Sequence, residues 1–278
     1  MLQFSKMHGL GNDFMVVDAI SQRFDVSKEG LARLADRRTG VGFDQLLLVE
    51  RPTVKGNAFK YRIFNADGSE VNQCGNGARC FARFVMDHEL TDLQEFWVET
   101  NAGRLKLSIL DDGQIRVNMG VPRFDPELIP LAFDQQQDQY SLSFDGKEYF
   151  FSALEIGNPH AVFRVDSVAK APVLELGESL QSHSLFPERV NAGFYELLSD
   201  NEISLRVFER GVGETLACGS GACAAVIAGI RQGLLKNTVR VHLAGGELLV
   251  EYDGQAEPVY LIGTATTVYR GKLSYDFL

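Results

Sequence analysis

Short stretches of alternating apolar and polar residues run through the first half of the chain, and a period of two predicts β-strands. The expected strands cover residues 2–7, 14–18, 46–50, 59–64, 96–99, 104–110 and 114–119. Two other stretches have helical spacing. Residues 27–38 are expected to form a helix, with Ser27 as its N-cap and Gly40 just past its end. From Asn76 onward, apolar residues recur three or four positions apart, which predicts a second helix with one buried face.

The second half of the chain repeats this order of elements. Its expected strands cover residues 149–156, 161–165, 193–198, 203–208, 239–243, 247–252 and 259–262. A helix is expected over residues 172–183. Residues 222–230, ACAAVIAGI, are apolar on every side, and a helix of that composition has to be buried all round.

A copied stretch indicates that the two halves arose by duplication. Residues 61–77 read YRIFNADGSEVNQCGNG, and residues 205–221 read LRVFERGVGETLACGSG, an offset of 144 positions (218 − 74) when the cysteines are aligned. The matching pairs keep the same order in both halves. They are Gly11-Asn12 with Gly157-Asn158, Gly42-Phe43 with Gly193-Phe194, Arg62 with Arg206, Glu70 with Glu214, and Cys74 with Cys218.

The duplication predicts an α+β fold with two pseudo-symmetric domains, and 278 residues suffice for two. Each domain should be a curved, mostly antiparallel, barrel-like sheet wrapped around a central helix, with its cysteine at the helix N-terminus. The first should span residues 1–118 and the second 119–263, with the tail 264–278 returning to the first. The active site is expected in the cleft between them.

Composition and charge narrow the class of protein. With 45% apolar and 23% charged residues the chain is typical of a globular protein, and its net charge of −10 argues against nucleic acid or a membrane as partner. The N-terminus lacks the apolar core of a secretion signal, and no apolar run is long enough to span a membrane. We therefore expect a cytoplasmic protein whose four cysteines are reduced thiols.

Cys74 and Cys218 are the candidate reactive groups. Each lies between glycine-rich turns just before a helix, where outward-pointing N–H groups lower the pKa of a thiol. Those N–H groups, expected on Gly75, Asn76, Gly219 and Ser220, can also hold a substrate carboxylate. If the halves face each other, one thiolate removes a proton from a carbon while the opposite thiol delivers one, which inverts a stereocentre.

The motifs around these residues resemble those of diaminopimelate epimerase over nearly the whole chain. The matching stretches are HGLGNDF (8–14), GVGFDQ (40–45), NADGSE (65–70), CGNGARC (74–80), GNPH (157–160), ERGVGET (209–215) and ACGSGACA (217–224). The resemblance implies interconversion of LL- and meso-2,6-diaminopimelate, in lysine and peptidoglycan precursor synthesis, with no cofactor and no metal. Family members are generally homodimers. Asn72 and Ala161 differ from the family's pattern, but both lie just outside the matched stretches.

The resemblance also assigns roles to residues. Cys74 and Cys218 are the acid/base thiols, and His160 and Glu209 correspond to residues that tune their protonation. The implied substrate-pocket residues are Asn12, Gln45, Asn65, Asn158, Asn191, Glu209 and Arg210. Since the substrate has two amino-acid ends, Arg210 can clamp the distal carboxylate with its guanidinium fork, and the amides can bind ammonium and carboxylate groups.

Plainer interpretations exist for each residue. A lone cysteine before a helix is commonly a small buried residue, as we expect for Cys80 and Cys223 inside their helices. Zinc is disfavoured because the C-x5-C and C-x4-C spacings separate the cysteines by helix, and no motif for phosphate binding is present. His160 could be structural, and Glu209 with Arg210 could be a surface ion pair. Asn12 and Asn158 could be turn formers.

Three other functions remain as alternatives. A relative on the same fold, such as a proline racemase or hydroxyproline epimerase, would not need Arg210 with Asn65, Asn158 and Asn191 for a second amino-acid end. A dithiol redox protein would be expected to carry C-x-x-C, which is missing. A non-catalytic amino-acid binding protein would not exchange the α-proton of its ligand with solvent.

Overall fold

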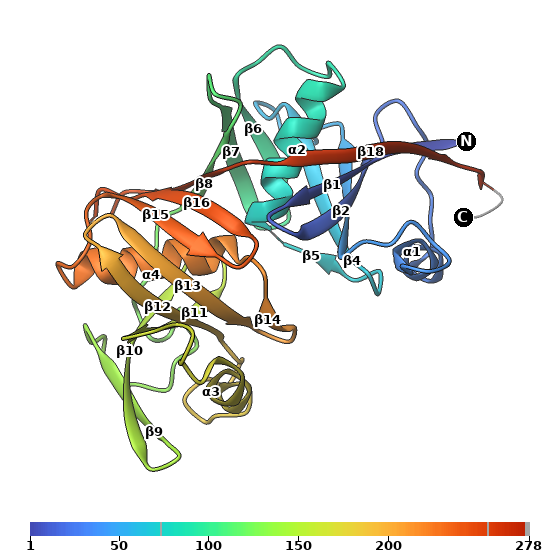
Figure 1. Cartoon of the computed structure of the whole chain (residues 1–278). Helices are drawn as coiled ribbons and strands as arrows, with labels where there is room; N and C mark the ends of the chain where they lie inside the picture. The colour runs from blue at the N-terminus through green and yellow to red at the C-terminus, as the bar shows by residue number, and fades with distance from the viewer. Residues whose placement is uncertain (73, 255, 276–278) are drawn as a thin grey trace. The chain divides into compact units, whose positions relative to one another are not determined.

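The computed structural model describes residues 1–72, 74–254 and 256–275, and the contacts of the chain divide it into two compact units. Unit 1 consists of Met1–Val117 and Gly263–Leu278, and unit 2 of Asn118–Ile262. Figure 1 shows the elements of both units in chain order.

In unit 1 a sheet with both parallel and antiparallel strand pairs packs against the central helix. Its strands are β1 (Leu2–Gly9), β2 (Asn12–Asp18), β3 (Gln45–Glu50), β4 (Phe59–Asn65), β5 (Glu70–Val71), β6 (Glu95–Thr100), β7 (Gly103–Ile109) and β18 (Thr266–Leu273), and β8 (Ile115–Gly120) continues into unit 2. Helix α2 (Gly75–Asp87) packs on β1, β2, β3, β7 and β18, and the short α1 (Lys28–Ala35) covers another core. Phe81 of α2 contacts the ring of Tyr61, with centroids 4.8 Å apart.

Unit 2 has the same plan. Its strands are β9 (Tyr140–Phe144), β10 (Lys147–Glu155), β11 (Pro159–Val165), β12 (Asn191–Ser199), β13 (Glu202–Glu209), β14 (Gly213–Thr215), β15 (Thr238–Leu243), β16 (Gly246–Glu251) and β17 (Val259–Gly263). Helix α4 (Gly219–Arg231) is buried along almost its whole length, as its all-apolar sequence requires, and packs on β10 to β13 and β16. Helix α3 (Val173–Leu180) packs on β12, β13 and β14.

Equivalent pairings confirm the duplication. In unit 1 the parallel pairs are β2 with β3 and β4 with β6, and in unit 2 they are β11 with β12 and β13 with β15, while most other pairs are antiparallel. The repeated Arg and Glu residues form the same bidentate ion pair in each unit. Arg62 contacts Glu70 at 2.8 and 3.0 Å, and Arg206 contacts Glu214 at 2.6 and 2.8 Å.

The structure differs from the sequence expectations at several ends. Helix α1 stops at Ala35 rather than 38, because the carboxylate of Asp36 accepts the N–H groups of Arg38 and Thr39 and closes a turn there. Helix α4 begins at Gly219, directly after the cysteine expected at its N-terminus and three residues before the apolar run 222–230. The strands β5 and β14 have too few residues for a period-two pattern and were not expected. The five-residue strand β9 was also not expected, although its residues alternate between apolar and polar.

The tail forms β18, which pairs antiparallel with β1, and residues 276–278 of the predicted tail lie outside the described residues. Over the part of the chain that the structure describes, no helix has the length and apolar character to cross a membrane.

Candidate active site

Cys74 is the N-cap of α2, as the sequence predicts. Its backbone is extended (φ −148°, ψ 116°), and its carbonyl accepts the first helical hydrogen bond, from Ala78 N–H at 2.8 Å. The sulfur accepts the N–H of Gly77 at 3.4 Å, and its thiol donates to Asn12 Oδ1 at 3.9 Å. The cap thus aims the sulfur at N–H groups of the first helical turn, which also contains Gly75 and Asn76.

The other predicted residues of unit 1 gather at one edge of its sheet. Asn12 and Gln45 begin the parallel strands β2 and β3, and Asn65 ends the antiparallel neighbour β4, so all three lie at the same edge. Gln45 Nε2 donates to Asn65 Oδ1 at 3.0 Å. The buried Gln45 Oε1 has no hydrogen-bond partner among the described residues, which leaves an acceptor for a ligand donor such as an ammonium group.

Cys218 is the N-cap of α4, again as predicted, with Gly219 and Ser220 in the first turn. Its backbone is also extended (φ −120°, ψ 109°), but its side chain makes no capping hydrogen bond. The sulfur lies 3.7 Å from Ser220 Oγ, and the residue is buried with 4% of its surface exposed.

The expectation that both thiols have lowered pKa values is wrong for Cys218. Burial raises the pKa of the Cys218 thiol well above its usual range, and the neighbouring Glu209 carboxylate raises it further. Hydrogen bonds from Ser220 and the Gly221 N–H oppose this shift but are too weak to reverse it. The helix N-terminus therefore acts on a thiol that its surroundings keep protonated.

The predicted residues of unit 2 meet at the equivalent edge of its sheet. Asn158 and His160 lie at the start of β11, Asn191 starts β12, and Glu209 ends β13 with Arg210 next. Asn191 Oδ1 accepts the backbone N–H of Arg210 at 2.9 Å, and Arg210 Nη2 donates to Asn158 Oδ1 at 3.5 Å. These hydrogen bonds hold the Arg210 guanidinium beside the side-chain amide of Asn158, the residue that corresponds to Asn12 in the repeat.

Glu209 and His160 are titratable residues of this site, Glu209 beside Cys218 and His160 near Arg210. Burial raises the pKa of Glu209, although hydrogen bonds from Thr215 (Oγ1 to Oε1, 2.5 Å) and from the Cys218 thiol lower it. Burial, with a smaller contribution from Arg210, lowers the pKa of His160 to about 3. His160 is fully buried and neutral at pH 7, and neither ring nitrogen has a hydrogen-bond partner among the described residues.

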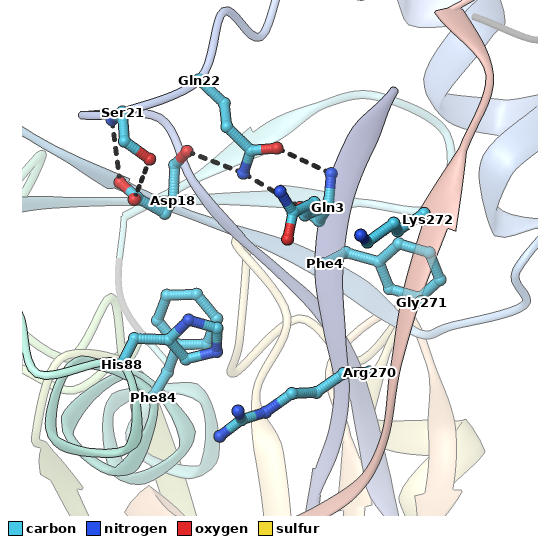
Figure 2. A pocket seen from close by; sticks show the side chains of 10 residues that line it. All are labelled: Gln3, Phe4, Asp18, Ser21, Gln22, Phe84, His88, Arg270, Gly271 and Lys272. Carbon is cyan, nitrogen blue, oxygen red and sulfur yellow. Dashed lines mark hydrogen bonds between the residues drawn. The ribbon is translucent and has the colours of Figure 1, made fainter.

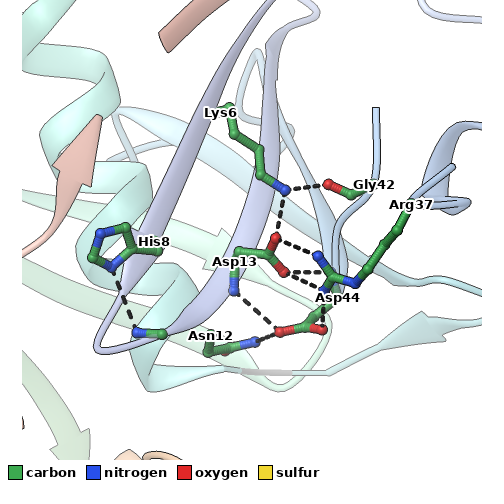
Figure 3. A network of polar contacts seen from close by, with 8 residues as sticks. Lys6, His8, Asn12, Asp13, Arg37, Gly42 and Asp44 are labelled. Atoms are coloured by element: carbon green, nitrogen blue, oxygen red, sulfur yellow. Dashed lines mark hydrogen bonds and ion pairs between the residues drawn. The ribbon is translucent and has the colours of Figure 1, made fainter. Parts of the chain in front are cut away.

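A polar network beside Asn12 was not predicted from the sequence. Figure 3 shows Lys6, Asp13, Arg37 and Asp44 joined by ion pairs, with Asn12 hydrogen-bonded to Asp44. The signal was present, because Asp13 follows Asn12 in HGLGNDF and Asp44 precedes Gln45 in GVGFDQ. Thr215, which donates to Glu209, lies likewise in the ERGVGET motif and was missed.

A separate hollow of about 230 Å³ opens beside β1 and β18 of unit 1, and none of the predicted site residues lines it (Figure 2). Its lining residues are Gln3, Phe4, Asp18, Ser21, Gln22, Phe84, His88, Arg270, Gly271 and Lys272. Gln22 bridges the carbonyls of Gln3 and Asp18 there. Among the described residues, no cluster of three His, Cys, Asp or Glu side chains is arranged to bind a metal ion.

Known proteins match the chain over both units. The family model described as diaminopimelate epimerase matches residues 4–124 and 152–268. Two relatives with that name, from Teredinibacter turnerae and Nitrosospira multiformis, are 54% and 51% identical over 98% and 99% of this chain and 99% of each relative.

Solved structures of low identity share the fold. A hydroxyproline epimerase from Agrobacterium vitis, with bound trans-4-hydroxy-L-proline, matches with a TM-score of 0.71 at 14% identity over 97% of this chain and 91% of that chain. A phenazine biosynthesis protein of the PhzF family from Bacillus anthracis matches with a TM-score of 0.68 at 17% identity over 98% and 99%.

Proposed function

Because the chain belongs to the diaminopimelate epimerase family, we propose that it interconverts LL- and meso-2,6-diaminopimelate by moving the proton on one α-carbon. The observation that carries the proposal is that each duplicated unit places a cysteine as the N-cap of its central helix. A stereocentre is inverted when a base takes the proton from one face and an acid returns one to the other, and two equivalent thiols suit those roles. No cofactor is needed for such a transfer.

The proposed reaction requires the two thiols to lie on opposite faces of the bound α-carbon, in a cleft between the units. Cys218 suits the role of acid for one direction, since burial and Glu209 favour its protonated form. In this proposal Cys74 lies on the opposite face of the α-carbon and serves as the base. The roles exchange in the reverse reaction, and Glu209 and His160 adjust the protonation of the thiols.

The polar residues of the two units fit a substrate with two amino-acid ends. The first-turn N–H groups of α2 and α4, from Gly75, Asn76, Gly219 and Ser220, would hold the carboxylate at the reacting carbon and stabilise charge that develops as the proton leaves. Arg210 would clamp the distal carboxylate, and the amides of Asn12, Gln45, Asn65, Asn158 and Asn191 would bind the remaining polar groups. A ligand with only one end would leave these groups unpaired.

We further propose that the protein acts as a cytoplasmic homodimer. The tail strand β18 presents exposed apolar and aromatic residues: Val268, Tyr269 and the following Tyr275 are 57%, 45% and 47% exposed. Apolar side chains gathered on a surface strand favour association with a second copy. Sedimentation analysis of the purified protein and of Tyr269→Ala measures this, and a monomeric wild type would contradict the proposal.

The test of the proposed function is proton exchange in D2O. NMR should show the α-proton of meso- or LL-diaminopimelate replaced by deuterium with the purified protein, while trans-4-hydroxy-L-proline, the control substrate, remains unlabelled. Cys74→Ala and Cys218→Ala should each abolish epimerisation, because inversion needs a group on both faces. Cys80→Ala and Cys223→Ala, buried in the helices, are the matched controls. Substantial turnover in either variant of the first pair would contradict the two-thiol mechanism.

A further inference from the structure

Four side chains of unit 1 form a row of hydrogen bonds that runs from a guanidinium to a carboxylate. Arg79 donates to Asn76 Oδ1 at 3.0 Å, Asn76 Nδ2 donates to Asn12 Oδ1 at 3.4 Å, and Asn12 Nδ2 donates to Asp44 Oδ2 at 2.9 Å. We call Arg79, Asn76, Asn12 and Asp44 the amide chain. Cys74 joins it in the middle, since its thiol donates to Asn12 Oδ1.

The two ends of the amide chain fix the direction of every hydrogen bond in it. Arginine only donates and an ionised carboxylate only accepts, whereas an amide can do either. If Asn12 were reversed, its carbonyl would face the Asp44 carboxylate and its NH2 group would face the NH2 group of Asn76. The chain therefore holds Asn12 with its carbonyl oxygen toward the sulfur of Cys74.

Asp44 is itself held firmly, as Figure 3 shows. Its Oδ1 accepts from Arg37 at 2.8 Å, and its Oδ2 accepts the backbone N–H of Asp13 at 3.1 Å in addition to Asn12. Arg37 also forms a fork on the carboxylate of Asp13, at 2.8 and 2.9 Å, and Lys6 binds the same carboxylate. Burial opposes ionisation of Asp13, yet the bonds from Arg37 and Lys6 hold its pKa well below the usual range.

Among the residues that the structure describes, unit 2 forms no such chain. The repeat places Asn158 at the position of Asn12, but Tyr195 at that of Asp44, Ser220 at that of Asn76 and Cys223 at that of Arg79. Asn158 turns its oxygen to Arg210 instead, and the carboxylate near Cys218 is Glu209. The group beside the thiol thus differs between the units. The amide carbonyl of Asn12 lies beside Cys74, and the carboxylate of Glu209 lies beside Cys218.

We propose that Asp44 is a positioning residue for Cys74, acting through Asn12, whose carbonyl oxygen it keeps turned toward the thiol. A fixed acceptor holds the thiol hydrogen in one direction and favours the protonated sulfur. The part that Cys74 plays in proton transfer rests on the proposed function, but the hydrogen-bond arrangement does not. Loss of the Asp44 carboxylate should release Asn12 and make Cys74 ionise at lower pH.

The other groups around Cys74 leave this effect measurable. Burial raises the pKa values of Tyr61 on β4 and Cys80 on α2, so both stay neutral through the neutral range, and Arg79 stays charged. Gly77 N–H donates to the sulfur, and none of the variants considered below changes that residue. The charged groups of the network beyond Asn12 are Lys6, Asp13, Arg37 and Asp44, and the ring of His8 on β1 accepts the N–H of Gly11 next to Asn12.

The experiment measures the rate of Cys74 alkylation by iodoacetamide as a function of pH, by peptide mass spectrometry on the full chain without substrate. Asp44→Ala should move the midpoint of the Cys74 profile down by about 0.5 to 1 pH unit, which is the size expected for losing one hydrogen bond to the neutral form. Cys218 in the same samples is the internal reference, and its profile should not move. Asp44→Asn, which must turn an NH2 group toward either Arg37 or Asn12, should shift the Cys74 midpoint in the same direction.

Asp36→Ala is the matched control. Asp36 shapes the same loop through hydrogen bonds to Arg38 and Thr39, carries the same charge and is exposed, but does not contact the amide chain. Its removal should leave the Cys74 profile unchanged. An equal shift in Asp36→Ala would show that the loop as a whole, and not the contact with Asn12, sets the profile.

A double-mutant cycle separates positioning from the charge of Asp44. Asn12→Ala should shift the midpoint downward by itself, and adding Asp44→Ala to it should cause no further shift, because the route through Asn12 is already gone. If the Asp44 effect persists without Asn12, or if neither Asp44 variant moves the midpoint, the proposal is wrong. A wild type that alkylates as expected but does not exchange diaminopimelate protons would count against the proposed function alone.

Discussion

At the scale of single residues, Cys74 and Cys218 have the same place in their units but different surroundings. Both cysteines cap their helices at a glycine turn that precedes an apolar run. The pKa of Cys218 is raised by burial under the sheet and by Glu209, which lies nine positions earlier in the chain and is brought beside the sulfur by strand β13.

Arg210 gives the first prediction at this scale. Its backbone N–H is bound by Asn191 and its guanidinium touches Asn158, so the position of the side chain is set by unit 2 alone. Arg210→Lys should raise KM for diaminopimelate by about tenfold or more, because an ammonium cannot reproduce the bidentate fork. Steady-state kinetics measure this, and circular dichroism should show an unchanged fold. Normal affinity in the variant would mean that Arg210 is not the distal clamp.

His160 gives a second prediction, on stability. Its pKa is about 3 in the folded chain against 6.5 ordinarily, so between these values the unfolded state binds more protons and stability falls as the pH falls. The free energy of unfolding should lose up to about 1.4 kcal/mol per pH unit from this group below pH 6.5. His160→Gln should remove that slope in urea unfolding, and both proteins should be independent of this term above pH 7. An identical slope in the variant would contradict the burial of a neutral imidazole.

At the scale of elements, the glycines in the first turn of each helix have a steric role. A Cβ on Gly77 would lie 2.3 Å from the Tyr61 hydroxyl and 3.3 Å from side chains of Leu47 and Phe14, inside the core. A Cβ on Gly221 would lie 3.0 Å from Val207 and 3.2 Å from the Cys218 sulfur. The equivalent glycines thus face different neighbours, a packed core in one unit and the thiol in the other.

The two substitutions should therefore separate stability from activity. Gly77→Ala should destabilise the protein by about 1 to 3 kcal/mol, as overpacking in a core does. Gly221→Ala should cost less stability, since Val207 can give way, but should lower kcat by displacing the Cys218 sulfur. Thermal unfolding and epimerase assays of both variants measure this contrast. Equal loss of stability with full activity in Gly221→Ala would contradict it.

Element boundaries depended on contacts that the pattern of apolar residues does not contain. Arg37 lies where helical periodicity continues, yet it leaves the helix to bind Asp13 and Asp44. Helix α4 begins directly after its expected cap, Cys218, although the glycines in its first turn carry no apolar signal. The strand β5 has only two residues, and the ion pair between Arg62 and Glu70 joins it to β4 across the hairpin. Two residues are too few for an alternating apolar pattern, so the sequence does not predict this strand.

At the scale of the whole molecule, the repeat was the most informative feature of the sequence. Internal matches predicted two units of one plan, and equivalent parallel strand pairs and ion pairs confirm it. The repeat could not predict where the units differ. The amide chain of unit 1 needs Asp44, Asn76 and Arg79, whose counterparts in unit 2 are Tyr195, Ser220 and Cys223, and Glu209 of unit 2 corresponds to Asn65 of unit 1. The two thiols therefore have different hydrogen-bonding and charged neighbours.

The last prediction concerns oxidation of the whole enzyme. If both thiols approach one carbon of the substrate, mild oxidation without substrate should join Cys74 to Cys218, once the units bring their Cα atoms within about 7 Å. Activity should be lost and then restored by a dithiol reductant, while Cys80 and Cys223 stay reduced because they are fully buried. Since burial keeps the Cys218 thiol protonated, the rate should rise with pH rather than level off near neutrality. Bound diaminopimelate should protect by separating the sulfurs. Non-reducing peptide mass spectrometry after diamide treatment identifies the bond, and a Cys74–Cys80 or Cys218–Cys223 link in its place would show that the reacting thiols do not face one another.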